Sequence, residues 1–322
     1  MHELLWCPLF AFLIVSYWIS FFLGFVVSWV LVRVALPKLR RRLLDQPNAR
    51  SSHSLPVPRG GGVSFVVVGS AAVAFQGSWL PLLCVPLALV GFLDDRFNLP
   101  AALRYGVQVA TALVLLLISP WHIPSIGLLP WLLLLIAGTA VINFTNFMDG
   151  LDGIVAGCMA VLFAVAALRG IPALWPLVGA LLGFLLWNWS PAKVFMGDVG
   201  STFLGAVFAG VVLQQVSFQA AQGLLLVATP LLADAFLCVP RRVLAGQKVF
   251  QAHRLHLFQR LHQAGWPHAR VSSLYIGATA VLALALFWGG LPWLITIAAF
   301  ELLIGIWLDQ RVAVPFAIAS CS

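Results

Sequence analysis

Unbroken apolar runs are the feature that most constrains this chain. The run LLLLI at 132–136 contains no polar residue, and similar stretches follow one another along the 322 residues. With 62% hydrophobic and only 9% charged residues, the chain has too little polar surface to cover a water-soluble globule. A transmembrane barrel would alternate apolar and polar residues instead. The sequence therefore predicts an all-α, polytopic membrane protein in which residues 1–322 form a single integral-membrane domain.

Proline, glycine and charge clusters divide the hydropathy into about eleven predicted spans. A helix that crosses a bilayer needs about 20 mostly apolar residues. The predicted spans are 9–36, 61–77, 79–94, 100–119, 126–145, 153–169, 172–189, 200–218, 222–240, 272–289 and 291–309. The first is too long for the apolar core of a signal peptide and lacks a basic segment before it, so we expect it to be retained.

Basic residues concentrate in two polar loops, 37–60 and 241–271, which hold 12 of the 18 lysines and arginines. Eight spans separate the loops, which puts both on the same side, and the positive-inside rule makes that side cytoplasmic. Shorter cytoplasmic loops are expected near 94–99, 146–152 and 190–199, with the N-terminus periplasmic and the C-terminus cytoplasmic. The net charge of +8 thus reflects basic cytoplasmic loops, which orient the protein in the membrane, and does not indicate nucleic acid as a partner.

Acidic and cysteine residues are distributed very differently. Six of the ten acids fall at or near the predicted cytoplasmic ends of spans: Asp94, Asp95, Asp149, Asp152, Asp198 and Asp234. Carboxylates so close would repel unless a cation neutralised them, and oxygen-only ligands favour a hard ion such as Mg²⁺. Alternatively, each acid caps a helix or pairs with a loop arginine. The five cysteines are scattered singly, without metal-site spacing, and are expected to serve packing.

Two segments concentrate these polar residues. In NFTNFMDGLDG at 143–153, Asn143, Asn146, Asp149 and Asp152 recur at every third position, which predicts a polar site, although Asp152 could instead cap the next helix. In KVFMGDVG at 193–200, Asp198 lies between glycines that let a backbone approach a ligand, and Lys193 could meet a phosphate. The alternative for the second segment is an ordinary turn at a helix start.

Two further segments offer positive charge. Arg59 in PRGGG at 58–62 suits phosphate contact, or the glycines simply open the next span. A helix over 250–261 would put His253, His256 and Arg260 in one narrow arc opposite leucines and a phenylalanine. Such a helix would lie in the membrane interface and meet anionic lipid or a pyrophosphate. His262 and His268 are expected at the surface.

Taken in order, these motifs resemble the polyprenyl-phosphate N-acetylhexosamine-1-phosphate transferases of glycosyltransferase family 4. That family includes the O-antigen-initiating enzyme and the phospho-MurNAc-pentapeptide translocase. The resemblance is carried by DQPNARSSH at 45–53 with PRGGG, LDD at 93–95, the 143–153 segment, VFMGDVGS at 194–201 and HRLH at 253–256. The two-histidine motif and arginine-rich first loop are more similar to the O-antigen and exopolysaccharide branch.

The resemblance implies an enzyme of the bacterial inner membrane with its active site on the cytoplasmic face. It would transfer a sugar-1-phosphate from a UDP-N-acetylhexosamine to undecaprenyl phosphate, release UMP and start O-antigen or another surface polysaccharide. Mg²⁺ or Mn²⁺ would be the cofactor. The resemblance implies that Asp94 and Asp95 are a catalytic acidic pair and that Asp198 is a metal ligand. Asp198 is thereby expected to be catalytic too, and Asp95 is a second candidate ligand for the metal. The resemblance implies that the substrate-binding residues include Asn143, Asn146, Asp149, Asp152, His253 and His256. From their charge, Arg59, Lys193 and Arg260 are expected to bind the phosphates of the substrate as well.

Two alternatives stay open at this point. One is the peptidoglycan translocase within the same family. The other is an ion-coupled transporter that uses the carboxylates as an ion path, although only Glu301 lies well inside a predicted span. The lipid bilayer is a partner in each case, and the sequence leaves a homodimer open.

Overall fold

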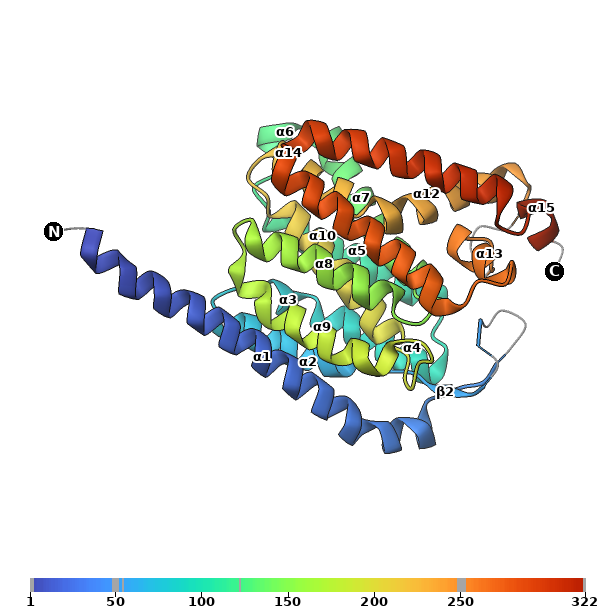
Figure 1. Ribbon diagram of the computed structural model, residues 1–322, viewed down its shortest axis with the longest axis horizontal. Coiled ribbons are helices and arrows are strands. Elements are labelled where there is room, and N and C mark those ends of the chain that lie inside the picture. The colour runs from blue at the N-terminus through green and yellow to red at the C-terminus, as the bar shows by residue number, and fades with distance from the viewer. Residues whose placement is uncertain (1–2, 48–51, 54, 122, 248–252, 321–322) are drawn as a thin grey trace.

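A computed structural model describes residues 3–47, 52–53, 55–121, 123–247 and 253–320, and its elements are almost all helices (Figure 1). They are α1 (Glu3–Arg42), β1 (Leu44–Asp45), β2 (Val57–Pro58), α2 (Val63–Phe75), α3 (Leu80–Leu83), α4 (Val85–Phe97), α5 (Ala101–Leu117), α6 (Ile123–Ile126), α7 (Leu128–Phe147), α8 (Ile154–Leu168), the 3₁₀ turn η1 (Pro172–Leu174), α9 (Trp175–Asn188), α10 (Asp198–Leu213), α11 (Phe218–Val227), α12 (Thr229–Leu244), α13 (Leu257–Gln263), α14 (His268–Arg311) and α15 (Phe316–Ala319).

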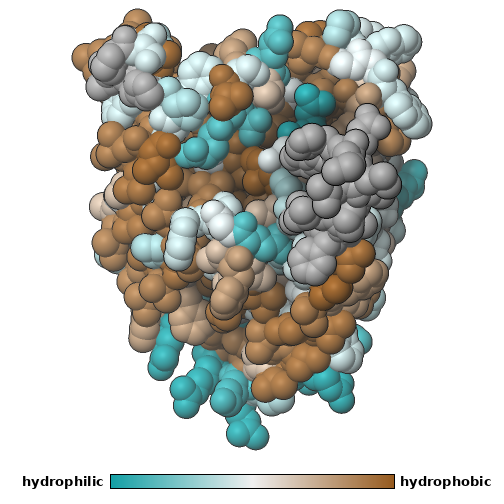
Figure 2. All heavy atoms as spheres, turned by 90° about the vertical axis from the view of Figure 1, so that its left-hand side faces the viewer, coloured by the Kyte–Doolittle hydropathy of each residue, from teal (hydrophilic) through white to brown (hydrophobic). Residues whose placement is uncertain are grey.

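The helices have the length and surface of a membrane protein. Among the described residues, three helices could cross a bilayer, namely the Val15–Arg42 part of α1, α7 and α14, and several shorter apolar helices lie beside them. Large apolar side chains face outward, including Trp18 at 50%, Leu129 at 69% and Leu303 at 64% exposure. From the end that carries the N-terminus, brown hydrophobic side chains cover most of the flanks (Figure 2). The chain is therefore a polytopic membrane protein, while the count of eleven spans stays a prediction.

One predicted span is bent in the structure, and one predicted break between spans is present. The predicted span 222–240 is not one straight helix, because α11 ends at Val227, α12 begins at Thr229, and the pair bends by 80°. Pro230, in the first turn of α12, cannot continue the preceding helix. By contrast, the break expected near 290 is present, since Gly290 has the non-helical φ of 63° and divides α14 into two arms.

Helix α10 lies at the centre of the bundle. Each of its residues from 199 to 213 is buried, and it packs against α4, α5 and α7. On another side, α9 lies between α1 and α8 (Figure 1). Asp198 is the first residue of α10, so a helix that is buried along its length positions this carboxylate.

Two glycines allow α9 to approach α1 closely. Gly179 and Gly183 lie one turn apart, and a Cβ atom at either position would overlap the α1 backbone at Phe21 or Phe25. Small residues spaced by four typically form such close contacts between membrane helices, where backbone packing replaces the hydrophobic effect. The α1–α9 contact therefore depends on glycine at positions 179 and 183.

We expect Gly183→Ala to lower the free energy of unfolding by about 1–3 kcal/mol, because the new methyl group must push α9 away from α1. The measurement is thermal unfolding of the purified protein in detergent. Gly106→Ala on α5 is the control, since a Cβ there would meet nothing within 4 Å and alanine favours a helix. Equal stability of the two variants would contradict the packing argument.

The polar loops meet at one end of the bundle, opposite the N-terminus (Figure 1). Strands β1 and β2 pair antiparallel there, and the Phe195 N–H donates to the Pro58 carbonyl over 2.8 Å. One ring nitrogen of His268 lies 3.0 Å from the Ser52 carbonyl. Loops predicted to share a face of the membrane thus contact one another.

Candidate active site

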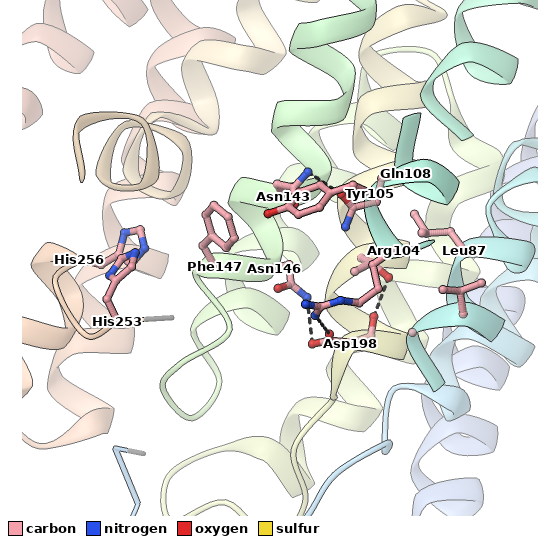
Figure 3. A pocket seen from close by; sticks show the side chains of 13 residues that line it. Leu87, Arg104, Tyr105, Gln108, Asn143, Asn146, Phe147, Asp198, His253 and His256 are labelled. Carbon is pink, nitrogen blue, oxygen red and sulfur yellow. Dashed lines mark hydrogen bonds and ion pairs between the residues drawn. The ribbon is translucent and has the colours of Figure 1, made fainter. Parts of the chain in front are cut away.

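A cavity of about 230 Å³ lies between α4, α5, α7, α10 and the segment that precedes α13 (Figure 3). Its polar lining consists of Arg104, Tyr105, Gln108, Asn143, Asn146, Asp198, Thr202, His253 and His256. Of the residues predicted to form the site, it therefore brings together Asn143, Asn146, Asp198 and the two histidines. The acid and amide groups lie on one side and the histidines on the other.

Asp198 is held by two neighbours in this cavity. Its Oδ1 accepts a hydrogen bond from the Asn146 side chain over 3.0 Å, and Asn146 also donates to Ser201 Oγ over 3.0 Å. The other carboxylate oxygen lies 3.6 Å from Nη1 of Arg104. This geometry fixes the direction of the carboxylate and leaves it partly exposed, at 32% of its side chain.

The adjacent acids Asp94 and Asp95 have different partners. Asp94 accepts hydrogen bonds from Arg104 over 2.8 Å and from the Leu99 N–H over 2.6 Å. The oxygens of Asp95 accept from the first two N–H groups of α10, those of Asp198 at 3.1 Å and Val199 at 3.4 Å. Asp95 therefore caps the helix that carries Asp198, and a carboxylate is favourable at that positive helix end.

Asp149 adds a further carboxyl group beside this cluster, in the turn between α7 and α8. Burial raises the pKa of Asp149 well above its usual value, and the charges of Asp198, Asp95 and Asp152 raise it further. Arg104 offsets part of the negative charge, and Arg59 lies 3.9 Å from Asp95. A cluster of oxygen ligands with excess negative charge suits a hard divalent cation.

Asp152 lies outside the cavity lining and joins separate loops. It accepts the Ala192 N–H over 3.1 Å and lies 3.1 Å from Nδ1 of His268. The alternative that Asp152 caps the next helix is wrong, because α8 follows Gly153 and has no side-chain cap. The expectation that His268 is a plain surface residue is wrong too, since its side chain is only 12% exposed.

The glycines at 60–62 form a packed joint between loops. The N–H groups of Gly61 and Gly62 donate to the carbonyls of Phe195 and Met196 over 2.9 and 3.0 Å. Arg59 forms an ion pair with Asp45 and does not line the cavity. These contacts favour the alternative in which the glycines open the next span, and not a phosphate-binding loop.

Lys193 also lies outside the cavity lining. Its side chain is exposed, and its ammonium lies 5.5 Å from the ring centre of Trp187.

The predicted helix over 250–261 is wrong over 253–256 and present from Leu257. Residues 250–252 lie outside the described residues, His253–His256 is not helical, and α13 begins only at Leu257. The cause is Asp234 on α12, whose carboxylate accepts the N–H groups of Leu257 and Phe258 over 2.8 and 3.0 Å and fixes the helix start there.

Arg260 consequently does not share a face with the two histidines. It is 1% exposed, donates to the carbonyls of Leu255 and Val314 over 3.1 and 2.9 Å, and forms an ion pair with Asp309. Arg260 joins α13 to the end of α14 and does not line the cavity.

The two histidines differ in charge. Burial alone would lower the pKa of His256, but the carboxylate of Asp234, 3.6 Å from Nδ1, outweighs burial with a contribution from Cys238 and raises this pKa to about 9. Burial lowers the pKa of His253 to about 3, with contributions from the positive charges of His256 and Arg242. Near neutral pH the cavity therefore faces one imidazolium and one neutral imidazole.

Arg104, Gln108 and Asp234 contribute to the site but were not among the predicted site residues. Gln108 accepts a hydrogen bond from Asn143 over 2.6 Å. Arg104 and Gln108 are four residues apart, so they share one face of a helix, and this polar pair in a mostly apolar run is the signal that could have revealed them.

Comparison with known proteins identifies the family. The model of glycosyl transferase family 4 matches residues 79–216, a range that includes Asp94, Asp95, Asn146 and Asp198. Decaprenyl-phosphate N-acetylglucosaminephosphotransferase of Mycobacterium leprae is 33% identical over 292 residues, covering 72% of this chain and 73% of that protein. The chain belongs to glycosyl transferase family 4. The expectation of this family is confirmed.

Two other relatives cover more of the chain. Undecaprenyl-phosphate alpha-N-acetylglucosaminyl 1-phosphate transferase of Salmonella typhi is 30% identical over 299 residues, 82% of this chain and 81% of that protein. Phospho-N-acetylmuramoyl-pentapeptide-transferase of a Synechococcus strain is 31% identical over 317 residues, which cover 85% of this chain and 92% of that protein. Both branches considered from the sequence are therefore represented among the relatives.

Proposed function

We propose that this protein transfers N-acetylglucosamine 1-phosphate from UDP-N-acetylglucosamine to undecaprenyl phosphate and releases UMP. The observation that carries the proposal is a single cavity in which Asp198 and Arg104 face two histidines. Phosphoryl transfer needs this combination of metal-binding and cationic groups, because its catalysis is mainly positioning and charge neutralisation. The names of the Mycobacterium leprae and Salmonella typhi relatives support the same sugar.

The donor groups present suit Mg²⁺ or Mn²⁺. Asp198 would be the principal ligand, because its carboxylate is partly exposed in the cavity and belongs to a cluster with excess negative charge. Asp95 is the weaker candidate, since both of its oxygens already accept N–H groups of α10. When bound, the ion would neutralise charge on the pyrophosphate.

The remaining roles fall to side chains of the chain itself. Arg104 and the imidazolium of His256 would bind phosphate oxygens, and Asn146 would keep Asp198 in position. The attacking oxygen of a lipid phosphate is largely anionic at neutral pH, since the second pKa of a phosphate monoester is about 6. A strong base is therefore unnecessary, and Asp94, which accepts from Arg104, would hold this arginine toward the cavity.

The same proposal includes the orientation in the inner membrane. Eleven spans with the N-terminus outside would put the cavity end of the bundle in the cytoplasm, where UDP-sugars occur. The concentration of lysine and arginine in loops 37–60 and 241–271 supports this orientation.

The test is release of UMP by purified protein supplied with undecaprenyl phosphate and UDP-N-acetylglucosamine, with and without Mg²⁺. We expect release that requires both lipid and metal. UDP-MurNAc-pentapeptide is assayed in parallel, because the Synechococcus relative makes that donor the second candidate. Turnover of the pentapeptide donor alone would move the protein to the peptidoglycan branch, and no turnover of any UDP-sugar by folded protein would overturn the proposal.

We expect Arg104→Gln to lower kcat/KM about 10²-fold, because the variant loses the cation that faces both Asp198 and the bound phosphates. The measurement is UMP release at varied UDP-sugar concentration. Arg96→Gln is the matched control, since Arg96 is exposed in the last turn of α4 and does not line the cavity. Equal losses in both variants would assign the effect to surface charge.

A further inference from the structure

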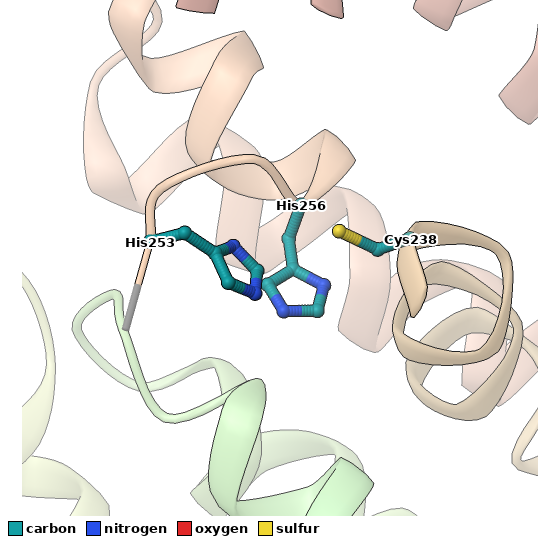
Figure 4. A group of neighbouring side chains, drawn as sticks. All are labelled: Cys238, His253 and His256. Atoms are coloured by element: carbon teal, nitrogen blue, oxygen red, sulfur yellow. The ribbon is translucent and has the colours of Figure 1, made fainter. Parts of the chain in front are cut away.

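A second group of ligand-type side chains lies apart from the carboxylates. Cys238 of α12 meets His253 and His256, and one donor atom of each lies within 4.8 Å of the other two (Figure 4). Cys238 is 4% and His256 is 2% exposed. The expectation that the cysteines serve packing alone does not explain why two imidazoles converge on one of them.

His256 is oriented as a metal-binding histidine would be. Its Nδ1 is buried, has no hydrogen-bond partner among the described residues, and lies 3.6 Å from Oδ1 of Asp234. Histidines that bind metals usually present one ring nitrogen to a carboxylate, which leaves the other for the ion. Asp234 is itself fixed by a hydrogen bond of 2.7 Å from the Tyr275 hydroxyl.

The donor set selects a different class of ion from the carboxylate cluster. Thiolate and imidazole bind Zn²⁺ and similar transition metals, whereas Mg²⁺ prefers oxygen. The thiolate of Cys238 together with the carboxylate of Asp234 would balance the two positive charges of the ion. We propose that Cys238, His253 and His256 bind a transition-metal ion of the zinc class, with the fourth position open to the cavity that both histidines line.

The required movement is small. Nitrogen and sulfur ligands around tetrahedral zinc are about 3.3–3.5 Å apart, given bonds of about 2.0–2.3 Å. The three donors lie within 4.8 Å of one another and must therefore close by at most about 1.5 Å. Binding through Nε2 of His253 would put its ring proton on Nδ1 and break the hydrogen bond of 3.2 Å that this atom accepts from the Leu255 N–H. The segment before α13 is non-helical, so no helical hydrogen bonds fix its backbone.

The binding test uses Co²⁺ as a spectroscopic probe on the purified full-length protein under a non-thiol reductant. We expect about one equivalent of tightly bound Co²⁺ with a thiolate-to-metal charge-transfer band. Cys238→Ser should remove the band and weaken zinc binding by more than about 100-fold, since loss of a direct ligand costs at least as much as loss of an outer partner. Cys158→Ser is the control, because Cys158 is also a buried free cysteine but lies on α8.

No band in the wild-type protein, or a band that survives Cys238→Ser, would overturn the proposal. So would equal loss of the band in the Cys158→Ser variant. If Cys238→Ser does not fold, His253→Gln replaces it, with the same expectation of at least 100-fold weaker zinc binding and the same overturning result.

A second consequence rests on the proposed function. A zinc ion would withdraw His256 from the phosphates, so micromolar Zn²⁺ should inhibit UMP release about tenfold at saturating Mg²⁺. Cys238→Ser should keep the basal activity and resist the inhibition. Metal binding without turnover would support the metal site and refute only the proposed transferase activity. Turnover that Zn²⁺ inhibits equally in the wild type and in Cys238→Ser would refute the metal site.

Discussion

Asp198→Asn is expected to lower the rate of UMP release by about 10³-fold while the protein stays folded. The substitution keeps the shape of the side chain and its contact with Asn146, but removes the negative charge that would hold the metal ion. Removing that charge also relieves repulsion from Asp94 and Asp149, so stability should not fall. Turnover and thermal unfolding are measured on the same detergent-purified sample.

Glu301→Gln is the matched control for this prediction. It also replaces an acid by its amide, on α14 and outside the cavity lining, and should leave turnover unchanged. Near-normal turnover in Asp198→Asn would exclude Asp198 as the principal metal ligand. A comparable loss in Glu301→Gln would instead indicate a general sensitivity to charge inside the membrane.

Much of the fold is predictable because hydropathy is a local property. Apolar stretches appear in the structure as helices, and the interruption expected near 290 is the kink at Gly290. The bend between α11 and α12 was not predicted, although Pro230 is visible in the sequence. A proline inside an apolar run marks either a kink within one span or a corner between two helices, and tertiary packing decides which.

The candidate site was predictable where polar residues repeat within one helix or at its end. Asn143, Asn146 and Asp198 were identified in this way, and all three line the cavity. Arg260 was misplaced because its predicted position depended on a helix register that a distant residue, Asp234, resets by capping α13. No short-range pattern contains that information.

The glycine motifs illustrate a second limit of the sequence. A glycine can free the backbone for a ligand, or it can allow two backbones to touch, and composition does not distinguish these uses. Gly197 has a φ of 73°, and a Cβ there would overlap the carboxylate of Asp95. Gly62 faces Gly200 in the same way. In both places glycine brings parts of the protein together, so the ligand contacts fall to side chains such as Arg104.

Asp234→Asn should lower the free energy of unfolding by about 3 kcal/mol. The carboxylate is 5% exposed, accepts two N–H groups at the start of α13 and the Tyr275 hydroxyl, and lies beside His256. An amide offers one acceptor oxygen instead of two and carries no charge. It therefore leaves the imidazolium of His256 without its counterion and some of the buried N–H and O–H donors without an acceptor. The expected readout is a Tm lower by roughly 5–10 °C in detergent.

Tyr275→Phe provides the graded control, because it removes a single hydrogen bond to the same carboxylate and should cost about 1 kcal/mol. If both variants lose the same stability, the Tyr275 contact accounts for the effect and the charge of Asp234 does not. If Asp234→Asn retains the wild-type Tm, the carboxylate does not fix the start of α13. A larger loss in Asp234→Asn than in Tyr275→Phe would show that the charge of Asp234 holds His256 in position. Because His256 lines the cavity, the shape of the site would then depend on an acid that lies outside the sequence motifs.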